Sequence, residues 1–365
     1  MKFIKGMVAM EKNSIFNEDA TFQHLVKNAK RKSLKRMILI SISVIISVAI
    51  LIYALICLGQ YFMYKEMDTQ TTQDHLVTTF VGANIEGNSS GYDHFFLAGN
   101  TKSPAYKNVN DHQINWLVNE HFYTILGTKA RVDNNHGGNG YRNNQRVLQF
   151  YPYSEPKIED DLGYLKTLPP FYSVEVGLSF TKELTLEEMA PKFPTAQWAW
   201  IIENGLLESI EEQKEAARKW EEQLTEQPQE PGVDFSKMPK TNFGLVTGDS
   251  AYGFQIHHSP AVNNEPFYSA EYFLEQLDMY AHDEKEALNI LREKMKARGE
   301  DVAGLNLGHH QKMYEAERLK ETIGDADAHS LKVSGIVLTG TLEEVLPYLE
   351  NDLVHYVSAG VILPY

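Results

Sequence analysis

The longest apolar run in the chain covers residues 37–59, where 23 consecutive positions carry no charged side chain. As a helix with a rise of 1.5 Å per residue, this run reaches about 35 Å, enough to cross a hydrocarbon core of about 30 Å. The pattern therefore predicts one transmembrane helix. Ser43 and Ser47 lie four residues apart within it and form a small-residue face that can pack against another helix.

The distribution of charge around this run predicts its orientation. Residues 1–36 carry nine basic and three acidic side chains, and the remainder carries 25 basic and 46 acidic ones, so +6 and −21 sum to the net charge of −15. Because basic flanks stay on the cytoplasmic side, the N-terminus is expected in the cytoplasm, with one pass through the cell membrane. A cleaved signal peptide does not fit, because the charged region and the apolar run are both too long.

The cytoplasmic tail is expected to contain a short amphipathic helix that begins near Asn17. Three interpretations of this helix stay open. It could rest on anionic lipid, at about 1 kcal/mol per cation, or dock its apolar stripe into the groove of a partner. DNA binding is disfavoured, because no helix-turn-helix fits in so short a tail. The residues that would bind a partner are Phe22, Leu25, Val26, Lys30 and Arg31.

The next region, residues 60–168, is expected outside the membrane and has weaker patterns. Residues 75–81 resemble a strand, and residues 111–126 place apolar side chains at spacings that fit a short helix. Residues 134–144 are rich in asparagine and glycine and predict a loop, whereas residues 146–151 predict a strand.

The C-terminal region, residues 169–365, contains a short internal sequence repeat. The segment TLEEMAPKF at 185–193 returns as TLEEVLPYL at 341–349, with five of nine positions identical. Each Thr-x-x-Glu predicts a capping box, in which the threonine side chain accepts from the third amide and the glutamate reaches back. The proline should end or kink each short helix.

An apolar strand is predicted on each side of these two short helices. The four strands fall at 172–180, 197–202, 331–339 and 354–363. A strand joined to another through a crossover helix favours a sheet with helices packed on it. The predicted fold class is an α+β ectodomain with repeated strand-helix-strand units, preceded by one transmembrane helix and a short cytoplasmic helix.

The segment between the two copies of this repeat is expected to be largely helical. The predicted elements are helices at 206–226, 270–298 and 311–323, a hairpin at 243–257 and a proline-bearing linker at 227–240.

Candidate catalytic chemistry is weak. The single cysteine, Cys57, excludes a disulfide framework and any multi-cysteine metal site. The Gly248-Asp249-Ser250 segment lacks the G-x-S-x-G elbow, and the glycine loop near Gly137 lacks a P-loop lysine. Two histidine pairs begin at His257 and His309, but neighbouring strand residues point to opposite faces. We therefore expect no catalytic residue, no metal and no cofactor, and interpret Trp198 and Trp200 as core.

Three segments carry a resemblance to a known family. They are residues 22–83 (from FQHLVKNAKRKSLKRMILI to VTTFVGA), residues 172–201 (YSVEVGLSFTKELTLEEM to WAWI) and residues 333–365 (VSGIVLTGTLEEVLPYL to VSAGVILPY). In these segments the chain resembles the sigma factor regulator proteins of Gram-positive bacteria, of the membrane-anchored anti-sigma-M type. The His-x3-Cys-x2-Cys pattern of zinc-containing anti-sigma proteins is absent from the tail.

The resemblance implies a regulator that negatively controls an extracytoplasmic-function sigma factor. The tail would hold the sigma factor, and the ectodomain, together with a second small membrane protein, would control its release. No direct contact with nucleic acid is implied. The alternative is an anchored cell-envelope binding protein or enzyme with no transcriptional role.

Overall fold

The computed structural model describes residues 3–87, 91–133, 137–138, 140–153, 155, 158–203, 205–226, 244–256, 265–297 and 315–364. The chain divides into two compact units. The first unit contains Met1–Lys65 and Thr124–Thr128, and the second contains Glu66–Tyr123 and Lys129–Tyr365. Two features of the sequence lie outside the described residues. They are the histidine pairs at 257–258 and 309–310, which were considered as metal ligands, and the linker predicted at 227–240.

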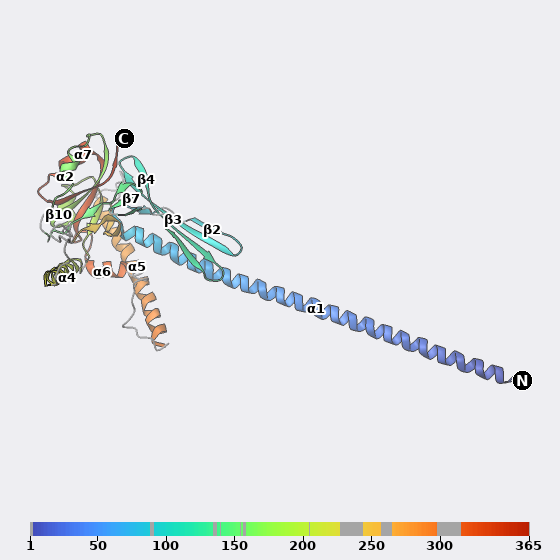
Figure 1. The fold of residues 1–365 in the computed structure, drawn as a ribbon. Coiled ribbons are helices and arrows are strands. Elements are labelled where there is room, and N and C mark those ends of the chain that lie inside the picture. The colour runs from blue at the N-terminus through green and yellow to red at the C-terminus, as the bar shows by residue number, and fades with distance from the viewer. Residues whose placement is uncertain are drawn as a thin grey trace. The chain divides into compact units, whose positions relative to one another are not determined.

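Helix α1 (Phe3–Phe80) is unbroken, as Figure 1 shows. The predicted tail helix forms, but it begins at Phe3 instead of near Asn17 and is part of one long helix. The strand predicted at 75–81 is wrong, because residues 75–80 are the end of this helix. The range contains no proline and its glycines are only Gly6 and Gly59, so nothing interrupts the helical hydrogen bonds. In the last turns threonine hydroxyls bond to helix carbonyls, as Thr79 Oγ1 does to His75 O at 2.9 Å. The helix ends before Gly82, whose φ is +108°.

An antiparallel sheet follows α1. Its strands are β1 (Glu86–Gly87), β2 (Gly91–His94), β3 (Ala98–Val109), β4 (His112–Thr124) and β5 (Lys129–Asp133). The helix predicted at 111–126 is therefore wrong. Asn110, with φ of +54°, reverses the chain between β3 and β4. Trp116, His121 and Tyr123 are buried on β4, because aromatic and β-branched residues suit a half-buried strand.

Short strands occupy the segment that was expected to be a loop and a single strand. They are β6 (Gly137–Gly138), β7 (Tyr141–Arg142), β8 (Gln145–Arg146) and β9 (Gln149–Phe150). The first three form a small sheet, and β9 pairs with β12 (Val246–Thr247). The hairpin predicted at 243–257 is wrong, because β12 and β13 each pair with a strand far away in the sequence.

A five-stranded antiparallel sheet forms the C-terminal region, in the order β13-β11-β14-β10-β15. The strands are β10 (Ser173–Thr185), β11 (Ala196–Ile201), β13 (Tyr252–Gln255), β14 (Lys332–Thr341) and β15 (Val354–Leu363). Strand β10 leads through α3 (Leu186–Met189) to β11, and β14 leads through α7 (Leu342–Leu349) to β15. Without the edge strand β13, this is the connectivity of a ferredoxin-like split β-α-β sheet.

Both predicted capping boxes are confirmed. Glu188 accepts from the Thr185 amide at 3.0 Å, and Glu344 accepts from the Thr341 amide at 2.8 Å. Helix α3 ends two residues before Pro191, as expected, whereas α7 continues through Pro347.

Other helices lie before the sheet and between β11 and β14. They are α2 (Leu162–Leu165), α4 (Leu206–Glu226), the 3-10 turn η2 (Gly248–Ser250), α5 (Glu265–Ala297) and α6 (Glu315–Ile323).

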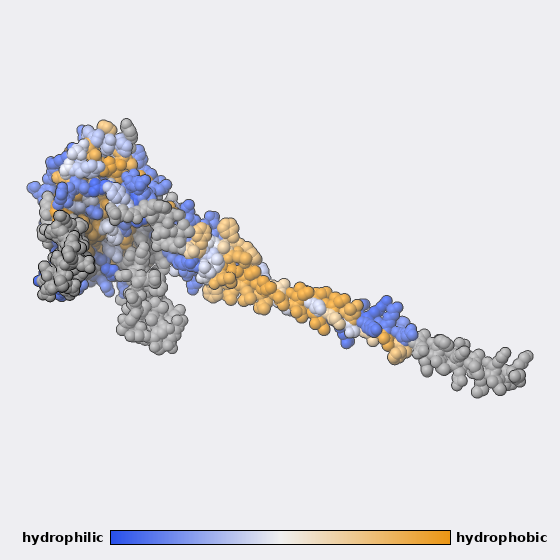
Figure 2. Space-filling model, viewed as in Figure 1, coloured by the Kyte–Doolittle hydropathy of each residue, from blue (hydrophilic) through white to orange (hydrophobic). Residues whose placement is uncertain are grey.

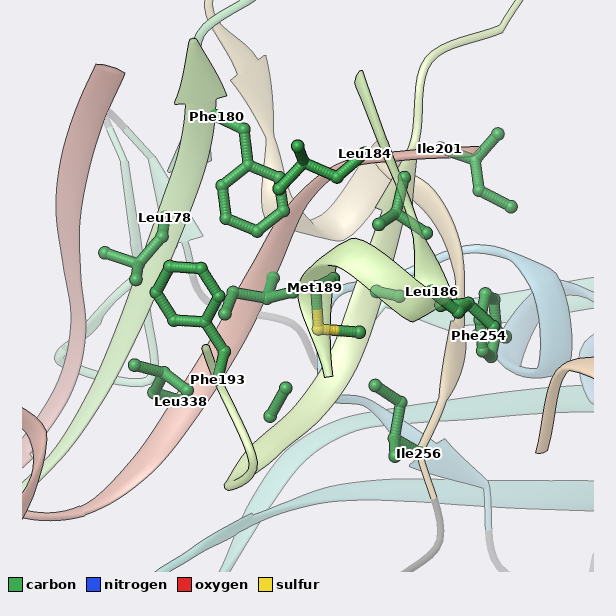
Figure 3. Close-up of a cluster of buried hydrophobic side chains, with 14 of the residues drawn as sticks. Leu178, Phe180, Leu184, Leu186, Met189, Phe193, Ile201, Phe254, Ile256 and Leu338 are labelled. Atoms are coloured by element: carbon green, nitrogen blue, oxygen red, sulfur yellow. The ribbon is translucent and has the colours of Figure 1, made fainter. Parts of the chain in front are cut away.

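Apolar side chains cover both faces of the C-terminal sheet. On one face Met189 packs among side chains of β10 and the segment after α3, including Phe180 and Phe193 (Figure 3). On the other face Trp198 and Trp200 pack on Phe150, with ring centroids 5.7 and 5.0 Å apart, which confirms their prediction as core. A sheet buried on both faces explains why its strands are continuously apolar instead of alternating.

Candidate functional site: an exposed tail and a buried polar network

The predicted partner-binding residues lie on α1 and are exposed. Phe22, Leu25 and Val26 have 66%, 62% and 37% of their surface accessible. Each residue turns a helix by 100°, so Phe22, Val26 and Lys30 follow one another on one side of α1. Leu25 lies beside Phe22, away from Lys30. A shallow open groove along α1 is lined by Phe22, Gln23, Val26, Lys27, Lys30, Arg31 and Leu34.

This groove combines apolar and cationic side chains on one helix face. The structure brings four of the five predicted residues together there, and Leu25 is not among them. A surface of this kind suits an acidic partner with apolar side chains, since cations steer the approach and burial of apolar area supplies affinity.

No residue in the apolar part of α1 is buried. Residues 22–72 contain a window of mean hydropathy 2.8 with none of it buried. Figure 2 shows this part as a continuous hydrophobic band. Ser43 and Ser47 are exposed within it. Exposed apolar surface of this length is costly in water, so α1 is a candidate membrane span and fits an anchor.

The C-terminal end of α1 is embedded in the second unit. Phe80 is buried, with its ring centroid 5.8 Å from that of Phe273 and 5.9 Å from that of Tyr280, both on α5. The chain then hydrogen-bonds to the η2 segment, from Gly82 N to Ala251 O at 2.9 Å and from Ala83 N to Gly248 O at 2.7 Å. The end of the helix is therefore fixed to the folded domain.

A buried ion pair joins the N-terminal sheet to the C-terminal sheet. Lys107 on β3 donates to both carboxylate oxygens of Glu175 on β10, at 2.9 and 3.1 Å, and both side chains are essentially inaccessible. Asn84 Nδ2 and the Val361 amide also donate to this carboxylate, at 3.0 and 3.3 Å. A buried charge persists only when it is paired and hydrogen-bonded, and Glu175 satisfies both conditions.

The indole ring of Trp116 connects this ion pair to a second charged group, the carboxylate of Asp249. Lys107 Nζ lies 4.2 Å from the ring centroid of Trp116, a cation–π arrangement. Trp116 Nε1 donates to Asp249 Oδ1 at 2.7 Å, and Arg142 Nε donates to Asp249 Oδ2 at 2.9 Å. We call these groups the buried polar network; its members are Asn84, Lys107, Trp116 and Glu175, which are buried, and Arg142 and Asp249, which are half-buried.

Gly360 is required beside this network. A Cβ at that position would collide with Glu175 Oε2 and would lie 2.7 Å from Leu148 Cδ2. The backbone of β15 therefore approaches the carboxylate as closely as only glycine permits.

Each acid of the network is paired with a cation and with further hydrogen-bond donors. Among the described residues no group of three or more His, Cys, Asp and Glu side chains could hold a metal ion.

Sequence reasoning missed the network. Asp249 was considered only as part of a hydrolase-like tripeptide, and Lys107 was not singled out. The available signal was Glu175 itself, a charged residue inside the apolar segment YSVEVGLSF, since a buried glutamate requires a partner. The position of Glu175 indicated that it has a partner, but it did not identify Lys107 as that partner.

Comparison with known proteins defines the class. The family model for the sigma factor regulator C-terminal region matches residues 165–361, and that for the sigma factor regulator N-terminal region matches residues 23–114. The C-terminal match alone covers more than half of the chain, so the chain belongs to the sigma factor regulator family. No curated protein and no solved structure matches it. Membership confirms the expected family and supports a general anti-sigma role in transcription regulation.

Proposed function

We propose that this protein is a membrane-anchored anti-sigma factor whose tail, residues 1–36, sequesters an extracytoplasmic-function sigma factor. The observation that carries the proposal is the N-terminal family match over residues 23–114, which begins in the exposed groove of α1 and continues through the apolar span. The tail residues assigned to the sigma factor are Phe22, Leu25, Val26, Lys30 and Arg31.

The proposed topology has residues 37–59 across the membrane, with the tail in the cytoplasm. Residues 60–168 form a juxtamembrane region outside, and residues 169–365 form the C-terminal α+β domain. The charge difference across the span supports this orientation. We interpret β10–α3–β11 and β14–α7–β15 as two copies of one strand-helix-strand unit, supported by their matching capping boxes.

Control by the ectodomain is proposed to act through the end of α1. Lys107 belongs to the part of the chain that matches the N-terminal family model, and Glu175 to the part that matches the C-terminal one. Their ion pair therefore couples the two family modules next to Asn84, four residues after α1 ends. A signal that rearranges the C-terminal domain would act on the helix through these contacts. A second small membrane protein is proposed to pack on Ser43 and Ser47.

The decisive experiment measures transcription from a sigma-dependent reporter in cells that carry tail variants. Val26→Asp and Leu25→Asp place a charge in or beside the binding face, so sigma factor is released and reporter output rises. His24→Asp is the matched control, because it adds the same charge on the side of α1 away from Phe22. Co-purification of the sigma factor with the full chain should be lost in the first two variants and kept in the control. Unchanged reporter output and retained sigma factor in Val26→Asp would contradict the proposal.

The topology is tested by labelling single cysteines in intact cells with a membrane-impermeant maleimide. In a Cys57→Ser background, Asp111→Cys should react from outside, and Lys27→Cys should react only after the cells are opened. The reverse labelling pattern would place the ectodomain in the cytoplasm and would contradict the proposed topology.

An anchored binding protein without a transcriptional role is the alternative function. It is favoured by a pocket of about 470 Å3 whose lining includes Trp200, Glu203, Asp249 and Ser250. Deleting residues 1–30 separates the two functions. The anti-sigma factor loses control of the reporter, whereas the binding protein keeps its phenotype.

A further inference from the structure

The pocket of about 470 Å3 lies wholly within the second compact unit. Its apolar lining includes Trp200, Ile201 and Leu206, and Trp200 belongs to the apolar cluster on one face of the C-terminal sheet. Val81, the first residue after α1, also lines it. Sites for small molecules have volumes of about 300–1,000 Å3 and are mostly apolar. This pocket therefore has the size and lining to hold a small molecule with an apolar body.

The charged side chains among the described residues that line the pocket are both acidic. They are Glu203, which follows β11, and Asp249 on η2. Both are half-buried, with 18% and 20% of the side chain exposed. Their cationic partners, Arg318 and Arg142, are not part of the lining. A molecule in the pocket would meet the carboxylates and not the guanidinium groups, which disfavours an anion.

Glu203 has hydrogen-bonding capacity that the fold leaves unused. Arg318 Nη2 donates to Glu203 Oε1 at 2.8 Å, whereas Glu203 Oε2 is buried and has no hydrogen-bond partner among the described residues. A buried carboxylate oxygen without a donor is unfavourable. Burial raises the pKa of Glu203, against the opposing effect of Arg318, so its charge is incompletely compensated. The terminal torsion of a glutamate is soft, so a small rotation of the carboxylate would present Oε2 to a donor in the pocket.

The other polar groups of the lining place no demand on charge. Thr247 and Ser250 are exposed, and their hydroxyl oxygens lie 2.8 Å apart in a hydrogen bond. Tyr252 forms a β-bridge with Val81, so the wall of the pocket is continuous with the segment after α1. A bound molecule would therefore contact the connection between α1 and the C-terminal sheet.

We propose that this pocket binds an organic cation, a small molecule that carries an ammonium or guanidinium group on an apolar body. The cationic group donates to Glu203, and the body packs on the apolar lining near Trp200. A cation is favoured over a neutral donor because charge-assisted hydrogen bonds are about twice as strong. Binding of this cation requires no sigma factor, so it goes beyond the proposed function and can fail or stand independently of sequestration.

The test is saturation-transfer difference NMR on the full chain in lipid nanodiscs, with empty nanodiscs as the background. Three probes share a phenyl body and differ in the end group: 2-phenylethylamine, 2-phenylethanol and phenylacetate. Titration gives a Kd for each probe. Glu203→Gln removes the charge and keeps the size of the side chain. Glu208→Gln is the matched control, because Glu208 is exposed on α4 and outside the lining.

A second variant keeps the test decisive if Glu203→Gln disturbs the fold. Thr247→Trp starts from an exposed side chain and fills the pocket without replacing a core residue. Far-UV circular dichroism of each variant should equal that of the original chain.

The amine is expected to bind with a Kd at least about tenfold lower than the alcohol, and phenylacetate should bind most weakly. Glu203→Gln should raise the Kd of the amine at least about tenfold and leave that of the alcohol unchanged. Thr247→Trp should weaken binding of the amine, and Glu208→Gln should have no effect.

Three outcomes would overturn the proposal. They are saturation transfer no greater than that of empty nanodiscs, equal Kd values for the amine and the alcohol, and selective amine binding that persists in Glu203→Gln or Thr247→Trp. Selective amine binding together with unchanged reporter output in Val26→Asp would refute sequestration and leave this inference standing. Raised reporter output in Val26→Asp without selective amine binding would refute this inference alone.

Discussion

Replacing Lys107 by methionine tests the central claim about the buried polar network. Methionine keeps most of the apolar stem and removes the ammonium group. The Glu175 carboxylate then retains only its two neutral donors, the side chain of Asn84 and the amide of Val361. Its charge stays buried without a cation.

The magnitude follows from the burial of the pair. Lys107 and Glu175 side chains are 1% and 0% exposed, so solvent does not screen the loss. Removing one partner of a buried pair costs about 3–5 kcal/mol. For a domain of this size each kcal/mol lowers the melting temperature by about 2–4 °C, which predicts a decrease of about 6–20 °C.

The assay is thermal unfolding of the full chain in nanodiscs, monitored by tryptophan fluorescence. The double variant Lys107→Met/Glu175→Met removes both charges and should recover most of the lost stability, since an apolar replacement of a buried pair is often neutral. Lys129→Met is the matched control. Lys129 pairs with Glu66 at 3.2 Å on the surface, and its loss should cost no more than about 1 kcal/mol.

Two results would refute this reasoning. One is a Lys107→Met variant no less stable than Lys129→Met. The other is a double variant that is as unstable as the single variant, because the cost would then come from packing and not from an unpaired charge.

Three further predictions concern packing and pH. Gly360→Ala should cost about 1–3 kcal/mol by overpacking against Glu175, whereas Gly163→Ala, with nothing within 4 Å of the added Cβ, should be nearly neutral in the same unfolding assay. Hydrogen bonds at the helix cap lower the pKa of Glu344 below its ordinary value of 4.5, so its stabilising contribution is present above pH 4.5 and lost as pH falls through the lowered value. Glu344→Gln should remove that loss from the acid limb of a pH–stability curve, and an unchanged acid limb would contradict the assignment. Phe80→Ala should cost about 3–5 kcal/mol, measured by denaturant unfolding, because the ring packs between two rings of α5; a loss below 1 kcal/mol would mean that α1 is not anchored there.

Local pattern predicted the elements whose signals are strong and self-contained. The bounds of Val354–Leu363 and Leu206–Glu226 were correct, and both capping boxes form as expected. A capping box is set by residues three apart, so its geometry is contained in the local sequence. The segment 111–126 was assigned to the wrong class, because short apolar spacings fit a helix or a strand equally well. Hydrogen bonding to β3 and β5 makes this segment strand β4.

The candidate site shows the same division. Exposure of Phe22 and Val26 on a helix could be expected from hydrophobic spacing beside an apolar run. The ion pair could not, because Lys107 and Glu175 are 68 residues apart and meet only when two sheets pack together.

The sequence by itself determined the apolar run, its charged flanks, the helix caps and the family, because each depends on residues close together in the chain. Tertiary structure decided which strands pair and which cation neutralises Glu175. These outcomes depend on contacts between segments that are distant in the sequence. Such contacts stabilise the fold only after the chain has paid the entropic cost of closing the intervening loops.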